Sequence, residues 1–222
     1  PFQIWRLATP MQPGERREIR FRTTDEAVRF RTTSVRDEVN NNGTFINDRT
    51  IAPTLGFSRD VLLRDRALRR KYGLPAELRM PRLEDDSARQ FNYLRHDSDW
   101  VNADITVSTE AGQTPIAPGY LVSGQTANGR RTAHFRTDAP IMNFFSIQSA
   151  NYAVRHGRWH DVDLAVYYDP RHAYNVDRMI RAMQTSFDIY TTQFSPFQFR
   201  QMRILEFPAY ATFAQSFANT VQ

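Results

Sequence analysis

The stretch that decides the fold is VDLAVYYDPRHAYNVDRMIRAMQTSFDIYTTQFSPFQFRQMRILEF, which runs from Val162 to Phe207. Residues 152–170 have the pattern of extended chain, and residues 199–207 have it again. Between them, residues 173–194 place apolar side chains three and four positions apart, which is the period of an amphipathic helix. The sequence therefore predicts extended chain, a long helix that packs against a sheet, and another strand. The apolar stripe of this helix comprises Val176, Met179, Ile180, Met183, Phe187, Tyr190 and Phe194.

The preceding part of the chain is predicted to be mostly β. Glu18–Phe30 alternates apolar and polar residues as a half-buried strand does. The Asn42-Gly43 pair predicts a tight turn into a strand at Thr44–Ile46. Trp100–Val107 has the clearest strand pattern, because it is alternating and β-branched. Further strands are expected at residues 120–122, 132–137 and 144–154, with a hairpin turn at Asn128-Gly129.

One helix is expected within this β-rich part. It would run from Arg59 to Tyr72, with Ser58 as its N-cap and with Gly73 and Pro75 ending it. Residues 74–98 lack clear periodicity and are predicted to form a long loop. Many strands with one inserted helix favour a β-sandwich or a saddle-like sheet. We therefore expect two domains, residues 1–155 and residues 156–222.

Composition excludes several classes of site. The chain has 222 residues and no cysteine, which rules out disulfides, thiolate nucleophiles and cysteine zinc sites. No run of eighteen apolar residues is present, so no membrane-spanning helix is predicted. The net charge is +5, but the arginine clusters are interspersed with acids, which is typical of a solvated surface. We therefore expect no nucleic-acid partner, and a β-sandwich that binds acidic polymers through arginine is the weakest of the alternatives.

The search for chemical motifs assigns no catalytic, cofactor-binding or metal-binding residue. His156 and His160 have a spacing that could hold a metal on a helix, but no H-E-x-x-H motif is completed. His172 is expected near the start of the long helix, and His96 and His134 stand alone. The acidic group Glu84, Asp85 and Asp86 is expected to be a solvated part of a loop.

Several segments together resemble the aminopeptidase N (gluzincin) family of zinc metallopeptidases. The order is similar to the passage from the β-saddle domain of that family into its thermolysin-like catalytic domain. In particular, it resembles the branch in which the peptidase is fused to an ABC transporter permease. The segments that carry the resemblance are Asn42–Phe45, Trp100–Tyr120, Phe144–Tyr152, Val166–Tyr168, His172–Met179, Phe194–Phe197 and Arg203–Pro208.

This resemblance implies a mainly β saddle domain followed by the first strand, helix and strand of a thermolysin-like α/β domain. It also implies a parent protein that removes N-terminal amino acids from peptides, with water activated on zinc. The family's zinc ligands, two His and a Glu, and its second Glu, which acts as the base, are absent here, so we expect this chain alone to be inactive. The family's Gly-x-Met-Glu-Asn motif, expected soon after Pro208, is replaced by Ala209–Phe217, to which no amine-binding role is transferred. The role of Phe213–Phe217 is left open.

Because the chain begins at Pro1 without an initiator Met and runs through Phe217 to Gln222 without a stop signal, we interpret it as a segment of a longer protein. The expected partners are peptide substrates and the remaining catalytic and membrane portions of that polypeptide. The segment itself is expected to be soluble, and the peptidase region of a membrane-associated parent to be extracytoplasmic. A second hypothesis is a pseudo-enzyme or interaction module, attached to a transporter permease, that binds a peptide or protein.

Overall fold

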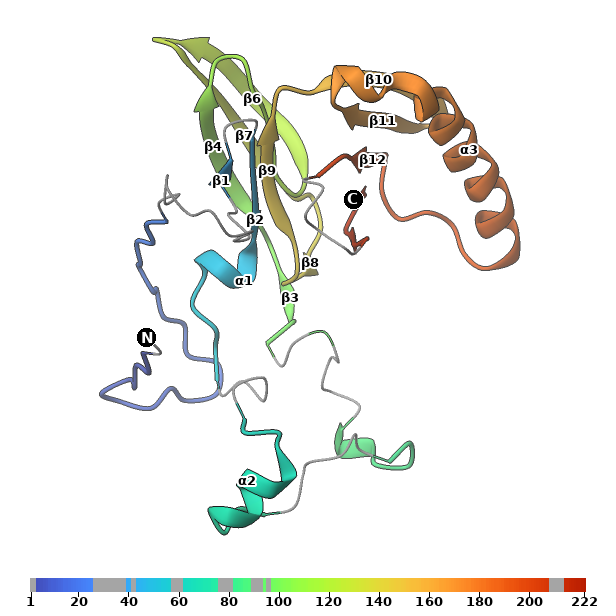
Figure 1. Cartoon of the computed structure of the whole chain (residues 1–222). Coiled ribbons are helices and arrows are strands. Elements are labelled where there is room, and N and C mark those ends of the chain that lie inside the picture. The colour runs from blue at the N-terminus through green and yellow to red at the C-terminus, as the bar shows by residue number, and fades with distance from the viewer. Residues whose placement is uncertain are drawn as a thin grey trace.

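The computed structural model describes residues 3–25, 39–40, 43–56, 62–75, 82–88, 94, 97–207 and 214–222. The described residues form mainly a set of β-sheets with one long helix at the side (Figure 1). The protein is mainly β with α, as the sequence predicted. Among the described residues, no helix is both long enough and apolar enough to cross a lipid bilayer.

An antiparallel three-stranded sheet has the order β4-β7-β6. These strands are β4 (Asp104–Glu110), β6 (Tyr120–Ala127) and β7 (Arg130–Arg136). The predicted turn between β6 and β7 is confirmed, since Asn128 and Gly129 both have positive φ, 51° and 72°. Two consecutive positive φ angles are what a tight hairpin turn requires, and Asn and Gly tolerate them best.

A second sheet joins segments that are far apart in the sequence. Its order is β1-β2-β9-β5, formed by β1 (Val39–Asn40), β2 (Gly43–Asn47), β9 (Ser146–Ala150) and β5 (Thr114–Ile116). All its pairings are antiparallel. A separate pair consists of β3 (Trp100–Val101) and β8 (Ile141–Met142). Buried Ala117, Ala133 and Phe135 form a core beside Ile105, Val107 and Ile147.

A third sheet has five strands in the order β10-β11-β12-β14-β13. Its strands are β10 (Ala153–Trp159), β11 (Val162–Tyr168), β12 (Gln201–Leu205), β13 (Ser216–Phe217) and β14 (Thr220–Val221). β11, β12 and β14 run parallel, while β10 and β13 pair antiparallel at the two edges. The sheet is therefore mixed, with its parallel strands in the centre.

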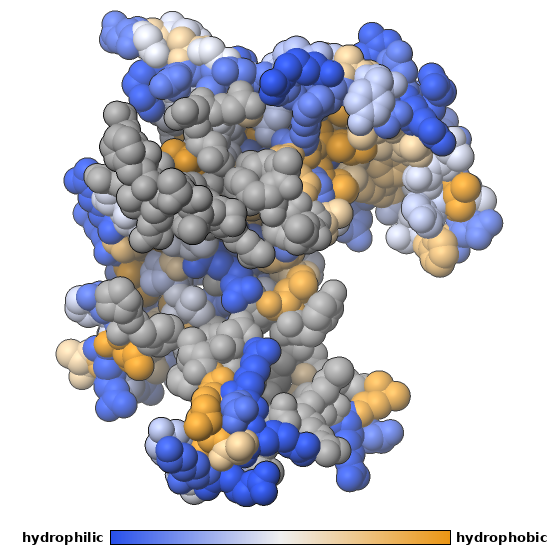
Figure 2. All heavy atoms as spheres, in the orientation of Figure 1, coloured by the Kyte–Doolittle hydropathy of each residue, from blue (hydrophilic) through white to orange (hydrophobic). Residues whose placement is uncertain are grey.

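The long helix α3 (Val176–Gln193) connects β11 to β12 and packs on this sheet. A 3₁₀ helix, η3 (Pro170–Asn175), leads into it. The buried part of the stripe, Val176, Ile180, Met183 and Phe187, packs against Val162, Leu164 and Val166 of β11. The remaining stripe residues are partly solvent-exposed: Met179, Tyr190 and Phe194 have exposed fractions of 38%, 58% and 77%. Figure 2 shows apolar residues among hydrophilic ones at the protruding end of this helix, at the right of the view.

Two local predictions were wrong, and one short helix was missed. Residues 18–25 of the expected strand Glu18–Phe30 form no strand and are exposed, and the rest of that range lies outside the described residues. Of the predicted helix from Arg59 to Tyr72, the described residues 62–72 are helical only in α2 (Arg66–Lys71), which Asp65 caps by accepting from the amide of Leu68. Ser58, the expected cap, also lies outside the described residues. The short helix α1 (Asp48–Ile51) was not predicted.

The expected end of the helix is confirmed, since Gly73 follows α2 with φ of +62°. Other predictions differ from the structure in their boundaries. The described parts of residues 74–98 form turns and one short 3₁₀ helix, η2 (Asp86–Ala88). Trp100–Val107 divides between β3 and β4, and residues 144–154 divide between β9 and β10. The expected domain boundary after residue 155 falls inside β10, so the division into two domains stays a prediction.

Candidate functional site

The histidines singled out in the sequence do not come together. His156 lies exposed in β10, and His160 lies in the turn after this strand with φ of +46°. The His160 ring contacts the Trp159 ring edge-on, with centroids 4.5 Å apart. His134 in β7 pairs with Asp104 of the neighbouring strand at 2.6 Å. His96 lies outside the described residues.

The acidic group in the loop has a local structural role. Asp85 accepts hydrogen bonds from the amide and the hydroxyl of Ser87, at 3.1 and 2.6 Å, and so stabilises a turn. Glu84 and Asp86 are exposed. Within the described ranges, no three His, Cys, Asp or Glu side chains lie close enough to hold a metal ion. The described residues therefore do not supply a zinc site of their own.

His172 belongs to a polar cluster where η3 meets the end of β12. Its Nδ1 contacts Glu206, whose other carboxylate oxygen accepts from the amide of Asp169 at 2.7 Å. Tyr152 donates its hydroxyl to the main-chain oxygen of Glu206 at 2.8 Å. Burial raises the pKa of Tyr152, and the nearby negative charge of Glu206 raises it further. This cluster fixes the start of the helix against the sheet.

Asp169 caps η3 and forms an ion pair at the same place. It accepts from the amide and the Nε of Arg171 at 3.0 and 2.9 Å, and it pairs with the Nη2 of Arg171 at 2.6 Å. These hydrogen bonds hold the pKa of the Asp169 carboxyl well below its usual range. The prediction that His172 lies near the start of the helix is confirmed, and the structure gives it a contact with Glu206.

Alternate residues of β12 connect the mixed sheet to the segment before β6. Gln201 donates to the carbonyl of Gly119 at 2.9 Å, and Arg203 donates to the carbonyl of Ala117 at 3.0 Å. Just before β12, the Arg200 guanidinium lies 3.9 Å from the centroid of the Tyr120 ring, a cation–π contact. The five-stranded mixed sheet and the three-stranded sheet that contains β6 are thus joined along one side of β12.

Arg203 is the residue of this junction that sequence reasoning missed. Only 5% of it is exposed, and its neighbours in the alternating strand, Met202 and Ile204, pack on the α3 side. Arg203 therefore points to the opposite face, together with the buried Leu205. The available signal was a charged residue in a parallel strand whose next residues, Ile204 and Leu205, and whose preceding residue, Met202, are apolar.

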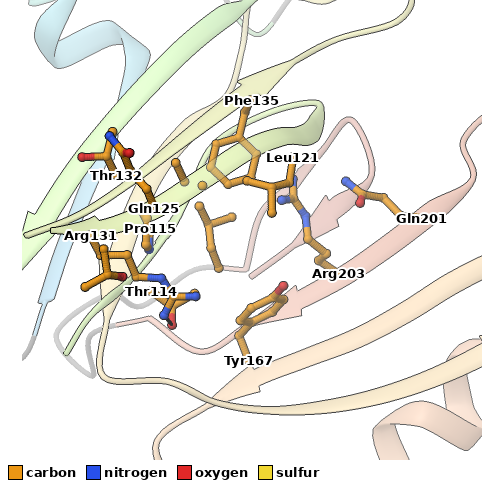
Figure 3. Close-up of a pocket in the computed structure, with 14 residues that line it drawn as sticks. Thr114, Pro115, Leu121, Gln125, Arg131, Thr132, Phe135, Tyr167, Gln201 and Arg203 are labelled. Carbon is orange, nitrogen blue, oxygen red and sulfur yellow. Dashed lines mark hydrogen bonds between the residues drawn. The ribbon is translucent and has the colours of Figure 1, made fainter. Parts of the chain in front are cut away.

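A pocket of about 470 Å³ lies between the β6–β7 hairpin, β5 and the face of the mixed sheet that carries Arg203. Figure 3 shows Arg203 and Tyr167 extending from β12 and β11, with Leu121 and Phe135 opposite. The lining also includes Arg131, whose Nη1 donates to the hydroxyl of Thr114 at 3.1 Å. The pocket is thus lined by two guanidiniums, by neutral polar side chains and by apolar ones, without a carboxylate among its described lining residues.

Comparisons with known proteins gave matches only among solved structures. No family model matches the chain, and no curated protein does. Two matching structures are those of an M1 zinc metallopeptidase from Deinococcus radiodurans, one of them a mutant bound to a Tyr-Ser-Ala substrate. Both share 15% sequence identity with this chain at a TM-score of 0.47. A two-domain M1 zinc metallopeptidase bound to L-arginine matches at 16% identity and the same TM-score.

These matches cover 57% of this chain. The chain in turn spans about 31% of the length of the structure bound to Tyr-Ser-Ala. The fold described above rests on the elements and pairings of this chain alone.

Proposed function

We propose that this chain is a non-catalytic part of a membrane-associated zinc aminopeptidase. Its β-rich portion would form a saddle domain, and its mixed sheet would form the first wall of the catalytic domain. The whole protein would remove N-terminal amino acids from peptides, while its zinc ligands would lie outside this chain. The peptidase region would be extracytoplasmic, attached to an ABC transporter permease.

The observation that carries the proposal is the β11–α3–β12 unit. It directly follows the β-rich part, its two strands pair in parallel, and its helix covers one face of the sheet. The sequence resemblance to the aminopeptidase N family implies this order, a β-saddle followed by a strand, a helix and a strand. The resemblance and the observed connectivity therefore support the same placement of the chain.

The test is the zinc content of the protein extended about 150 residues beyond Gln222, a length chosen to include a zinc-ligand helix of the type H-E-x-x-H followed by a further Glu. We expect one zinc per extended chain, measured by elemental analysis after dialysis. The 222-residue chain is the matched control and should retain none. Hydrolysis of aminoacyl anilides by the extended protein, abolished by a chelator, would then support the aminopeptidase activity.

A folded extension that binds no zinc would refute the aminopeptidase proposal. It would favour the second hypothesis, a pseudo-enzyme or interaction module that binds a peptide or protein. Circular dichroism and a cooperative thermal transition establish that the extension is folded, so that loss of zinc can be separated from loss of structure.

A further inference from the structure

Arg203 is a buried cation that has no carboxylate partner among the described residues. Its Nη2 donates to the carbonyl of Ala117, to the side-chain oxygen of Asn219 and to the hydroxyl of Thr220, at 3.0 to 3.1 Å. Its Nε donates to the same hydroxyl at 3.2 Å. All these acceptors are neutral. Within the described part of the chain, the second amino group of the guanidinium, Nη1, has no hydrogen-bond partner.

A buried charge without a counterion is energetically unfavourable, and proteins ordinarily pair such groups. Burial lowers the pKa of the Arg203 guanidinium to about 10, so it is still charged at neutral pH. The hydrogen bonds fix the plane of the guanidinium and leave one amino group available. This arrangement suits a planar anion that accepts from that amino group.

The pocket beside Arg203 has further features of a binding site. Arg131 supplies a second guanidinium, oriented by its hydrogen bond to Thr114. Ile116, Leu121 and Phe135 provide apolar surface between the charged groups. The volume of about 470 Å³ is in the range of small-molecule sites. A fully hydrated inorganic anion would leave this apolar surface uncovered.

We propose that this pocket binds an organic carboxylate that carries an apolar group. The carboxylate contacts Arg203, the apolar group packs against Leu121 and Phe135, and Arg131 adds positive charge to the same pocket (Figure 3). A ligand with the size of an amino acid or a dipeptide fits the volume. The carboxylate can come from a peptide C-terminus or from a free acid, which share this chemistry. This inference does not depend on zinc or on aminopeptidase activity.

The experiment is a titration of the full chain with N-acetylphenylalanine and with its neutral amide. The two probes have the same apolar group and differ only in the charge that the arginines would recognise. We expect the carboxylate to bind at least about tenfold more tightly by calorimetry, because charge-assisted hydrogen bonds are stronger than neutral ones. Equal binding of the two probes, or binding of neither, would overturn the proposal.

Matched arginine variants locate the site. Arg131→Gln should weaken binding of N-acetylphenylalanine about tenfold, because it removes one of the two positive charges of the pocket. Arg130→Gln, at the adjacent position of β7, is the control and should leave the affinity unchanged, since Arg130 bonds Ser108 and does not line the pocket. An equal loss in both variants would indicate non-specific charge attraction and would overturn the assignment.

Arg203→Gln tests the buried guanidinium directly. We expect it to abolish carboxylate binding, with folding checked by circular dichroism. If this variant does not fold, the Arg131 and Arg130 pair still decides the proposal.

A tripeptide with a free C-terminus, compared with the same peptide amidated, separates the two sources of the carboxylate, a peptide C-terminus and a free acid. Tighter binding of the free peptide than of N-acetylphenylalanine assigns the site to a peptide C-terminus, and weaker binding assigns it to a free acid.

Discussion

Gly157→Ala should destabilise the protein because β10 and α3 touch at this position. A Cβ at residue 157 would lie 2.7 Å from Cγ2 and 3.2 Å from Cδ1 of Ile180. Favourable carbon–carbon contacts lie at about 3.5–4.0 Å, so the nearest pair would overlap by several tenths of an ångström or more. Ile180 cannot easily rotate away, since β-branched side chains in helices strongly prefer one rotamer.

The magnitude follows from overpacking in a closely packed interior. Inserting a methyl group there destabilises a protein by about 1–3 kcal/mol. Ile180→Ala alone should destabilise by about 2–5 kcal/mol, because the side chain is buried in the core under α3. In that background the new methyl group meets no obstacle, and the loss of a glycine restricts the unfolded chain, which stabilises by about 0.4–1 kcal/mol.

The assay is urea unfolding of the wild type, both single variants and the double variant. We expect the double variant to be less destabilised than the sum of the single variants by about 1–3 kcal/mol. Gly124→Ala in β6 is the control, since its Cβ would meet nothing closer than 3.6 Å, and its change should stay within about 0.5 kcal/mol. Additive effects of Gly157→Ala and Ile180→Ala would refute the packing of β10 against α3.

The remaining predictions concern a turn and two titrating groups. Gly119→Ala should destabilise the protein by at least about 3 kcal/mol, since the φ of Gly119 is +84° and a Cβ would lie 2.4 Å from the backbone of β7. Gly129→Ala is the control and should cost only about 1 kcal/mol of stability, because Gly129 has positive φ but open space around it. Equal losses in thermal unfolding would contradict the contact between Gly119 and β7. Tyr152→Phe should lose about 1 kcal/mol at neutral pH with the hydrogen bond to the carbonyl of Glu206. Because the pKa of Tyr152 is raised in the folded protein, its contribution to stability is complete below the unfolded tyrosine pKa of about 10 and decreases above it. The difference in unfolding free energy between wild type and Tyr152→Phe should therefore narrow above about pH 10. A constant difference would contradict the raised pKa. Arg171→Ala should raise the pKa of Asp169 towards its ordinary value, as measured by NMR titration of the carboxyl group. Because the folded pKa is lowered, the stability that this carboxyl contributes is present above about pH 4 and is lost as the pH falls. A variant in which Asp169 titrates as in the wild type would contradict the ion pair.

Local patterns predicted the elements that carry their own signals. The spacing of Val176, Ile180, Met183 and Phe187 identified both α3 and its buried face. The same stripe overestimated the contact at its end, because Tyr190 and Phe194 are largely exposed. Periodicity records which side chains share a face, but it does not record how far the covered sheet extends.

Elements that depend on a distant partner could not be predicted in the same way. Glu18–Phe30 alternates like a strand, yet residues 18–25 are irregular, because alternation alone supplies no neighbouring strand to pair with. The sequence did not predict Arg203 as a pocket residue for a related reason. Its partner Ala117 lies 86 residues before it in the sequence, and its partner Thr220 lies 17 residues after it. Only the assembled sheets bring these residues together.

The pairing of β2 with β9 has a consequence for how this protein folds. Gly43 is opposite Ala150, so this pairing closes a loop of roughly a hundred residues. The β6–β7 and β10–β11 hairpins close over only a few residues and can form early. During synthesis, β2 can pair only with β1 until residues 146–150 have left the ribosome. The β1–β2 pair therefore joins the rest of the structure late, and until then the free edge of β2 is open to mispairing and proteolysis.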